Sequence, residues 1–249
     1  MSFKYNTAQR VTRKVYRKFF PVQKSSYRAG YVEDTCSVHL VSPEDFKNIF
    51  YQLHRAVAKV KGNDIGDYFE FGVFNGASLS SAYMTFKAMG QNSSRFFGFD
   101  AFQGLPAGSE NEDDDVWKKG FYACSFDQMQ ECLRRKNINS DDITWVQGWY
   151  DQTLNQETMN KHQIQKLGIA FIDCDTYSSS KSVLNFIRPL ITEPVILCFD
   201  DWKLNDLDIK GIGEYKSFNE FLGANSNIEA TEVKSYNRKS RSFLVKPKS

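Results

Sequence analysis

The pattern of apolar positions first becomes regular at residues 42–61, where it predicts an amphipathic helix. Ser42 suits the N-cap, Pro43 suits the first helical position, and Gly62 suits the position just beyond the end. The apolar positions that share one face are Phe46, Ile49, Phe50, Leu53, Val57 and Val60. This helix therefore has one side to bury against a core.

After residue 62 the pattern changes to short apolar runs that alternate with helix-like stretches. The runs predicted as strands are residues 67–72, 95–100, 143–148, 167–175 and 194–201, and the predicted helices are 77–89, 125–136 and 178–191. Nearly continuous apolar strands are typical of a parallel sheet covered by helices on both faces, so the fold class is α/β. The last two runs, 228–233 and 240–246, flank a turn-rich stretch and predict a closing antiparallel pair.

Glycines and a carboxylate mark the ends of the first two predicted strands, where an open parallel sheet binds its ligands. Gly72 and Gly76 enclose a turn whose main chain can approach a ligand, and the helix that begins at Ala77 offers free N–H groups to an anion. Asp100 can accept hydrogen bonds from both hydroxyls of a ribose. The turn lacks the glycine pattern of a pyrophosphate site, so it predicts a nucleoside with a smaller anion; an ordinary strand–helix turn is the alternative.

Aspartates mark the ends of two further strands. Asp173 ends the fourth, and Asp200 and Asp201 end the fifth. If these strands are neighbours, the carboxylates converge and raise one another's pKa unless a cation lies between them. An all-oxygen ligand set favours Mg²⁺, and no HExxH or cysteine cluster indicates zinc. The alternative is a hydrogen-bonded acid pair that caps loops.

Composition places the chain among soluble globular proteins. It has 249 residues, of which 41% are apolar and 25% charged, and no apolar stretch long enough for a membrane span. We expect no membrane span and no secretory signal. The five cysteines form no CxxC pair, which favours reduced thiols in a cytoplasm over a disulfide framework. Cys174 and Cys198 lie in apolar runs and are expected in the core.

The net charge of +2 is unevenly distributed. Residues 1–41 form a basic N-terminal arm or lid, in which Val11, Val15 and Phe19 recur at helical spacing; residues 42–249 form the main domain. The arm is interpreted as a solvated segment or an oligomer contact, with an anionic ligand or partner as the alternative. Nucleic acid is an unlikely partner because the rest of the chain is net acidic. The acidic run at 110–115 is expected to be a solvated loop, with a metal site as the alternative.

With these residues assembled, the chain resembles the macrocin O-methyltransferase (TylF-type) family, which uses S-adenosyl-L-methionine to methylate sugar hydroxyls. The resemblance lies in five stretches: FEFGVFNGASLS (69–80), FFGFDAFQGLP (96–106), VQGWYDQTL (146–154), IAFIDCDTYSSS (169–180) and VILCFDDW (195–202). It implies a Rossmann-like class I methyltransferase fold, with a mostly parallel seven-stranded sheet and an antiparallel C-terminal end. Homo-oligomers are also expected from it.

The resemblance implies a role for each site residue. The residues implied to hold the cofactor are Glu70, Gly72, Asn75, Gly76, Ser78, Asp100, Gly148 and Tyr150. Asp173, Asp200 and Asp201 would carry Mg²⁺. Where catechol-type enzymes have a lysine base, this chain has Thr176, so Asp173 or Asp175 is expected to take the proton.

The sequence thus predicts an Mg²⁺-assisted O-methyltransferase whose acceptor is a sugar or a glycosylated small molecule. The alternatives are a methyltransferase of the same fold with another acceptor, such as a lipid-linked glycan, a phenol or a nucleic acid, and a non-catalytic cofactor-binding protein. Trp149, Tyr177 and Trp202 are expected either to stack on a sugar or cofactor or to pack in the core.

Overall fold

The computed structural model of the protein describes residues 34–248. The amphipathic helix predicted in the basic arm lies outside these residues. Among the described residues, no helix is both long and apolar enough to cross a bilayer.

Seven strands form one sheet in the order β3-β2-β1-β4-β5-β7-β6. Their bounds are β1 Asp67–Phe71, β2 Phe96–Asp100, β3 Ile143–Gln147, β4 Leu167–Ile172, β5 Val195–Phe199, β6 Ile228–Val233 and β7 Arg241–Pro247. Strands β1 to β5 pair in parallel, whereas β7 runs antiparallel to both β5 and β6. The predicted α/β fold, with its antiparallel C-terminal pair, is confirmed.

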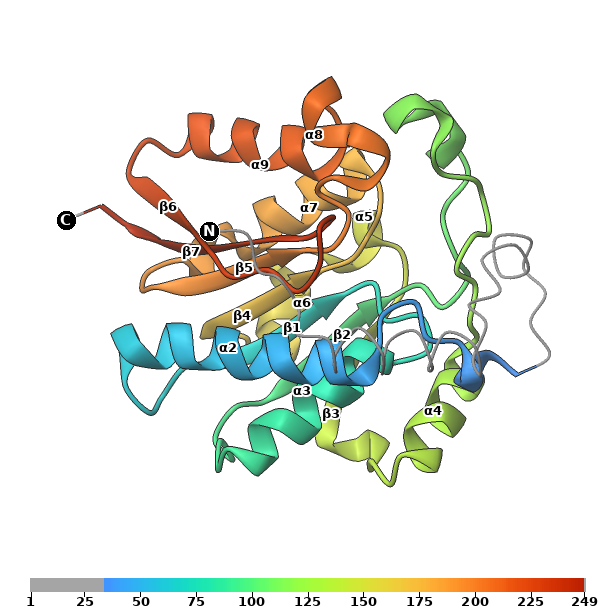
Figure 1. The fold of residues 1–249 in the computed structure, drawn as a ribbon, viewed down its shortest axis with the longest axis vertical. Coiled ribbons are helices and arrows are strands. Elements are labelled where there is room, and N and C mark those ends of the chain that lie inside the picture. Colours follow the sequence, from blue (N-terminus) through green and yellow to red (C-terminus); the bar gives the residue numbers. More distant parts are fainter. Residues whose placement is uncertain (1–33, 249) are drawn as a thin grey trace, which may run out of the picture.

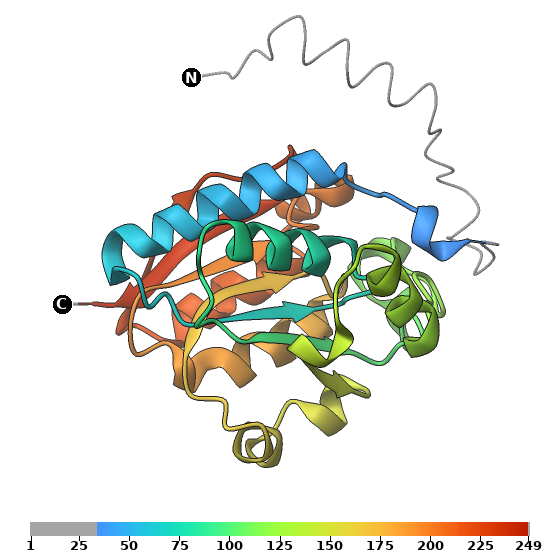
Figure 2. The same cartoon turned by 90° about the horizontal axis from the view of Figure 1, so that it is seen from below.

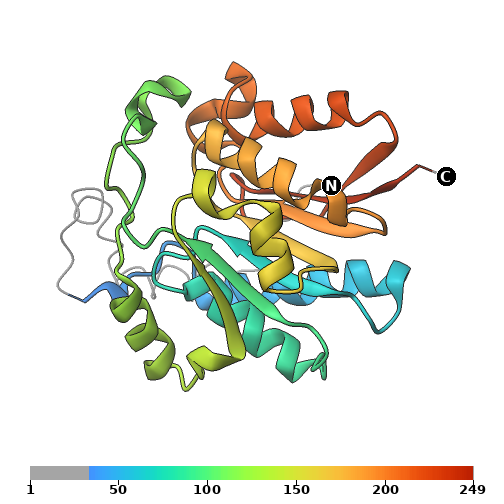
Figure 3. The ribbon, with the colours of Figure 1, turned by 180° about the vertical axis from the view of Figure 1, so that it is seen from behind.

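Helices cover both faces of the sheet. Their bounds are α2 Pro43–Lys61, α3 Ala77–Ala88, α4 Phe126–Arg135, α5 Tyr150–Thr153, α6 Gln156–Lys161, α7 Tyr177–Ile187, α8 Leu207–Lys210 and α9 Gly213–Ala224. Helix α2 crosses the front of the sheet in Figure 1, while α6 and α7 lie in front when the molecule is seen from behind (Figure 3). Figure 2 shows the resulting three layers, with one apolar core on each side of the sheet.

Helix α2 begins and ends as its sequence predicts. The Ser42 hydroxyl accepts the Asp45 amide hydrogen bond at 3.1 Å, and Gly62 follows the last turn at a φ of 78°. The apolar face packs on β4 through Phe46 and Phe50, whose rings contact Phe171. Val60 was expected on that face but is 49% exposed.

Helix α9 is absent from the sequence prediction, although it covers the sheet beside α7. It begins at Gly213 with a φ of 64°, and its N-cap residue, Ile212, forms no side-chain cap. Neither residue is a helix-start signal here, because isoleucine is a poor N-cap and glycine is a poor helix former. The burial of Phe218 and Phe221 stabilises α9 despite this weak start.

Candidate active site

A cavity of about 750 Å³ opens at the carboxyl ends of the parallel strands. Its walls come from the turn after β1, the ends of β2, β4 and β5, and the start of α5. Two further segments complete it: the strap, defined as residues 34–41, and the flap, defined as residues 101–124. The flap is the green segment that passes beside the sheet between β2 and α4 (Figures 1 and 3).

Gly72 joins two of these strand ends through direct main-chain contact. It adopts a φ of 87°, and a Cβ atom placed on it would lie 1.8 Å from the carbonyl oxygen of Asp173. The Asp173 amide in turn donates to the Phe71 carbonyl at 2.8 Å. Only glycine fits this position, so the turn after β1 and the end of β4 are held at a fixed separation.

The Asp100 carboxylate is hydrogen-bonded to the turn after β1. Its Oδ2 accepts the amides of Val73 and Phe74 at 2.7 and 3.0 Å, and its Oδ1 accepts the Phe102 amide at 2.6 Å. Burial raises the pKa of this carboxyl, and the three amides lower it in part. Because each carboxylate oxygen has two lone pairs, Oδ1 can still accept from a ligand hydroxyl.

The cofactor residues expected in the glycine turn divide into two groups. Gly72, Asn75 and Ser78 line the cavity, whereas Glu70 and Gly76 do not. The Glu70 carboxylate is fully buried beneath the turn, where it accepts the Tyr68 and Ser78 hydroxyls and the Leu79 amide. Burial raises the pKa of Glu70 to about 8. It therefore braces the start of α3 rather than facing a ligand, and that part of the expectation is wrong.

Asn75 holds the strap against the turn. Its Nδ2 donates to the carbonyls of Thr35 and Val38 at 2.8 and 2.9 Å, while its Oδ1 accepts the Ala77 amide at 3.2 Å. These hydrogen bonds use the side-chain amide of Asn75, which was expected to bind the cofactor. Val38 is thereby fixed as part of the cavity wall.

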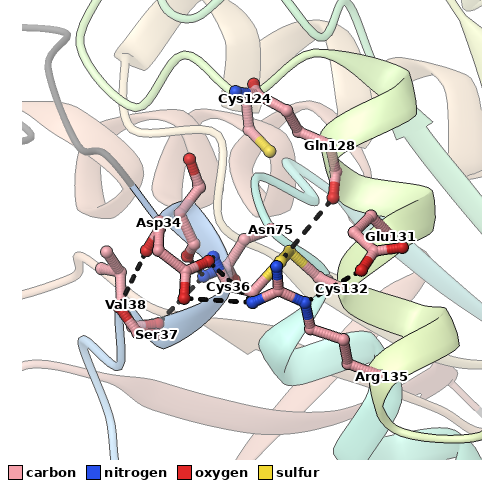
Figure 4. The surroundings of a disulfide bond; sticks show 12 residues. Asp34, Cys36, Ser37, Val38, Asn75, Cys124, Gln128, Glu131, Cys132 and Arg135 are labelled. Atoms are coloured by element: carbon pink, nitrogen blue, oxygen red, sulfur yellow. Dashed lines mark hydrogen bonds and ion pairs between the residues drawn. A yellow bond between two sulfur atoms is a disulfide. The ribbon is translucent and has the colours of Figure 1, made fainter.

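A disulfide between Cys36 and Cys132 fastens the strap to α4, a pairing across 96 residues (Figure 4). The Arg135 guanidinium reinforces it with an ion pair to Asp34 at 2.9 Å (Figure 4). The expectation of five reduced thiols is wrong for this pair, because sequence spacing does not show which distant cysteines meet. The inferred cytoplasmic location loses this argument. Cys174 and Cys198 are buried thiols, as predicted.

Gly148 and Tyr150 lie at the far end of the cavity, beyond β3. The Gly148 amide donates to the Asp100 carbonyl at 3.0 Å, and its φ is 137°. The Tyr150 hydroxyl donates to the Phe99 carbonyl at 3.3 Å. Both residues line the cavity, and their contact with an adenine ring stays a prediction.

Three aspartates converge at the ends of β4 and β5. One carboxylate oxygen each from Asp173, Asp200 and Asp201 lies within 4.8 Å of the other two. Burial and mutual repulsion raise the pKa of Asp173 and of Asp200 well above the ordinary value, and burial raises the pKa of Asp201 to about 6. The convergence expected from the strand ends is present.

Glu214, at the start of α9, is a site residue that the sequence analysis missed. Its side chain is fully buried, and its Oε2 accepts the Asp201 amide at 2.9 Å. Within residues 34–248, neither Glu214 Oε1 nor Asp200 Oδ1 has a hydrogen-bond partner. Buried oxygens without donors are costly, so this end of the cavity is electrostatically incomplete and suits a cation.

Asp175 lies beside the three converging acids and also lines the cavity. It has a φ of 65°, a left-handed conformation in which its main chain turns into the start of α7. Burial and the charge of Asp201 raise its pKa well above the ordinary value. It is absent from the trio of Asp173, Asp200 and Asp201, although its side chain is hydrogen-bonded to that of Asp201.

The flap is packed onto the body of the protein rather than solvated. Trp117 is buried against Leu204 and Leu207. Within the acidic run, Asp113 accepts the amides of Tyr177 and Gly213, both at 2.9 Å. The expectation that residues 110–115 form a solvated loop is therefore wrong for Asp113, which caps two helices.

The three aromatic candidates have different environments. Trp149 lines the cavity. Trp202 is buried against Phe199 and Phe243 in the core, with ring centroids 5.3 and 5.0 Å away. The Tyr177 hydroxyl donates to Glu220 at the surface. Only Trp149 is therefore placed to meet a ligand.

The sequence matches a family model described as macrocin-O-methyltransferase (TylF) over residues 47–236. The match begins within α2 and ends just before β7, so it contains the glycine turn, the flap and the converging acids.

Individual proteins show more distant similarity. An 8-demethyl-8-(2,3-dimethoxy-alpha-L-rhamnosyl)-tetracenomycin-C 4'-O-methyltransferase of Streptomyces olivaceus is 23% identical over 174 residues, which are 68% of this chain and 64% of that protein. This chain thus spans less than two thirds of that relative's length.

Two solved structures share the fold. The calicheamicin methyltransferase CalS11 superposes with a TM-score of 0.65 at 20% identity, covering 97% of this chain and 94% of that one. The O-methyltransferase TomG of Streptomyces achromogenes, in complex with SAM, gives 0.56 at 12% identity, covering 99% and 100%.

Proposed function

Because the chain belongs to the macrocin-O-methyltransferase (TylF) family, we propose that it transfers a methyl group from S-adenosyl-L-methionine to a hydroxyl group of a sugar or a glycosylated small molecule. The observation that carries the proposal is a single cavity lined both by the glycine turn and by the converging acids Asp173, Asp200 and Asp201. A methyl donor and an acceptor hydroxyl must meet, and this cavity offers adjoining sites for both.

The proposed cofactor site lies along the ends of β1, β2 and β3. The methionine part would face the turn at Gly72, Asp100 would accept a ribose hydroxyl, and Tyr150 would border the adenine. All three residues line the cavity. The SAM complex of TomG, which shares this fold, supports a donor of this class.

The proposed cation is Mg²⁺, held by Asp173, Asp200 and Asp201. The residues fit it, because the ligand set consists of oxygens and Asp200 Oδ1 is buried without a partner among the described residues. When bound, Mg²⁺ supplies Lewis acidity that lowers the pKa of an acceptor hydroxyl.

Asp175 is proposed as the general base. It lines the cavity beside the three acids and outside the ligand set, with its side chain hydrogen-bonded to Asp201. In its ionised form it can receive the hydroxyl proton. The acceptor oxygen forms a bond to the methyl carbon while the carbon–sulfur bond breaks. That electron pair goes to sulfur and leaves S-adenosylhomocysteine. The chain's task is to align the two reactants and exclude water.

A sugar acceptor is favoured by what the similar proteins act on. The tetracenomycin-C enzyme is named for a rhamnosyl 4'-hydroxyl. In this chain, Trp149 at the cavity wall is suited to stack on the apolar face of a sugar ring.

Calorimetry with S-adenosyl-L-methionine, with and without Mg²⁺, combined with a screen of glycosides and labelled cofactor, tests the proposal. We expect cofactor binding without Mg²⁺ and label transfer only with it. Absence of cofactor binding would reject any methyltransferase. Transfer to phenols, lipid-linked glycans or nucleic acids alone would reject the proposed acceptor class.

A further inference from the structure

The buried aspartate of the flap connects that segment to the acids at the far side of the cavity. Asp113 is 8% exposed, whereas the side chains of its neighbours Asp114 and Asp115 are 60% and 65% exposed. Asp113 does not line the cavity. Its carboxylate accepts two main-chain amides and lies beside the Trp117 side chain, so any effect on the reaction must act through other residues.

Asp113 binds the first amide of two different helices. Its Oδ2 accepts from Tyr177, the first residue of α7, and its Oδ1 accepts from Gly213, the first residue of α9. Amides at a helix start have no partner within the helix, and a negative charge there is favourable. Since Ile212 provides α9 with no side-chain cap, Asp113 supplies the cap from the flap.

Each of these helix starts continues directly into the cluster of acids. Glu214 follows Gly213, is fully buried and accepts the Asp201 amide at 2.9 Å. Asp175 lies two residues before Tyr177. Asp113 therefore fixes the peptide units that precede Glu214 and follow Asp175.

A second contact supports the same attachment. Glu112 accepts the amide and the hydroxyl of Ser178 at 2.9 and 2.7 Å. The base of the flap has a further attachment, because Trp117, whose side chain lies beside Asp113, is buried against Leu204 and Leu207. Loss of the Asp113 contacts should thus loosen the tip of the flap and the start of α9 without unfolding the segment.

We propose that Asp113 is a positioning residue for methyl transfer. It fastens the flap to the starts of α7 and α9 and, through Glu214, sets the main chain of Asp201. This proposal rests on the proposed function. It adds that the flap and the acids form one unit, so the acids adopt their working arrangement only while the flap is attached.

Asp113→Asn tests the proposal, with Asp114→Asn as the matched control. Asparagine has one acceptor oxygen, and its NH₂ group would face an amide donor, so one of the two bonds is lost. We expect kcat to fall about tenfold or more, with the KM for S-adenosyl-L-methionine changed less than about twofold. Asp114 forms an ion pair with Lys210 at the surface. Its substitution by asparagine should leave both kcat and the KM for S-adenosyl-L-methionine unchanged.

Three readouts separate positioning from general loosening. The kcat loss of the double variant Asp113→Asn, Glu214→Gln should be smaller than the product of the two single losses, because both substitutions act on Asp201 through the start of α9. Hydrogen exchange at the Tyr177 and Gly213 amides should accelerate in Asp113→Asn and not in Asp114→Asn. Calorimetric titration with MgCl₂ should show a severalfold weaker affinity in Asp113→Asn.

The proposal is overturned if Asp113→Asn has the kcat of the control, or if the two substitutions multiply. Unchanged exchange at both amides would also overturn it. If the unsubstituted protein transfers no methyl group, the proposed function fails; exchange and MgCl₂ titration then decide whether Asp113 still organises the acids.

Discussion

The two ends of the cavity differ in how many hydrogen bonds their carboxylates accept. At the end formed by β1 and β2, Asp100 accepts three main-chain amides, and Glu70 beneath it accepts three donors. At the end formed by β4 and β5, Asp200 Oδ1 and Glu214 Oε1 accept none from the described residues. One end is complete in the protein alone. The other gathers carboxyl groups whose charge is removed by protonation or balanced by an added positive partner.

This difference suggests that the two ends have different tasks: the first binds the cofactor and the second takes part in methyl transfer. A site whose polar groups are already paired keeps its shape and can bind a nucleoside without rearrangement. A site with unbalanced charge has free energy to gain from a cation. We therefore expect substitutions at the first end to change cofactor affinity and substitutions at the second end to change turnover.

Asp200→Asn should give the largest effect and the sharpest test of the second end. Removing one charge from the converging acids should lower kcat by about two to three orders of magnitude. Cofactor affinity, measured by calorimetry, should stay within about threefold, because Asp100 and the glycine turn are untouched. Asp206→Asn, at an exposed position six residues on, is the control. Equal losses of turnover and affinity would contradict the separation of the two ends.

Cys36→Ser should give the next largest effect, through the strap of the first end. Loss of a cross-link spanning 96 residues should lower the free energy of unfolding by about 2–4 kcal/mol, measured by denaturant titration. Cofactor affinity should also fall, since Val38 forms part of the cavity wall. A dithiol should destabilise the unsubstituted protein to the same level and leave Cys36→Ser unchanged. A further effect of the dithiol on the variant would contradict this.

Asp100→Asn should reduce cofactor affinity about tenfold or more, because charge-assisted bonds are replaced and an NH₂ group faces the amides of Val73 and Phe74. The kcat at saturating cofactor should change little. Calorimetry and saturation kinetics measure the two quantities, and Asp127→Asn at the exposed start of α4 serves as control. A fall in kcat with affinity unchanged would reverse the assignment of the two ends.

Glu70→Gln should give the smallest effect on turnover and cofactor affinity, and its main effect should be on the pH dependence of stability. The folded-state pKa of Glu70 is raised to about 8 from an ordinary value of 4.5, so the folded state retains a proton that the unfolded state loses between these values. The stabilising contribution is thus complete below the ordinary value and lost as pH rises toward 8. Relative to Glu70→Gln, the unsubstituted protein should lose about 1 kcal/mol per pH unit in thermal unfolding. Parallel curves would show that Glu70 is ionised throughout.

The fold was largely predictable because its elements carry local signals. Ser42 and Gly62 bound α2, and nearly continuous apolar runs mark the parallel strands. Helix α9 was not predicted, because it begins at a glycine and its cap, Asp113, lies 100 residues earlier in the sequence. A cap donated by a distant segment leaves no local pattern.

The acids of the site were predictable for a similar reason. Strand ends meet at one edge of a parallel sheet, so Asp173, Asp200 and Asp201 had to converge. Side-chain direction was harder to predict. Glu70 alternates with Phe71 along β1 and points beneath the turn, and the amide of Asn75 is occupied by a strap whose position depends on a disulfide. Pairings of this kind are set by tertiary structure alone.

Gly72 has a consequence for how such a protein can diversify. Main-chain contact sets the distance between the glycine turn and the converging acids, because Gly72 lies directly against the carbonyl of Asp173. Under the proposed function, the distance over which the methyl group is transferred is therefore set by the main chain at the ends of β1 and β4. Residues of the flap and strap that line the cavity can then change, and the choice of acceptor with them. The transfer distance stays the same, because the sheet sets it.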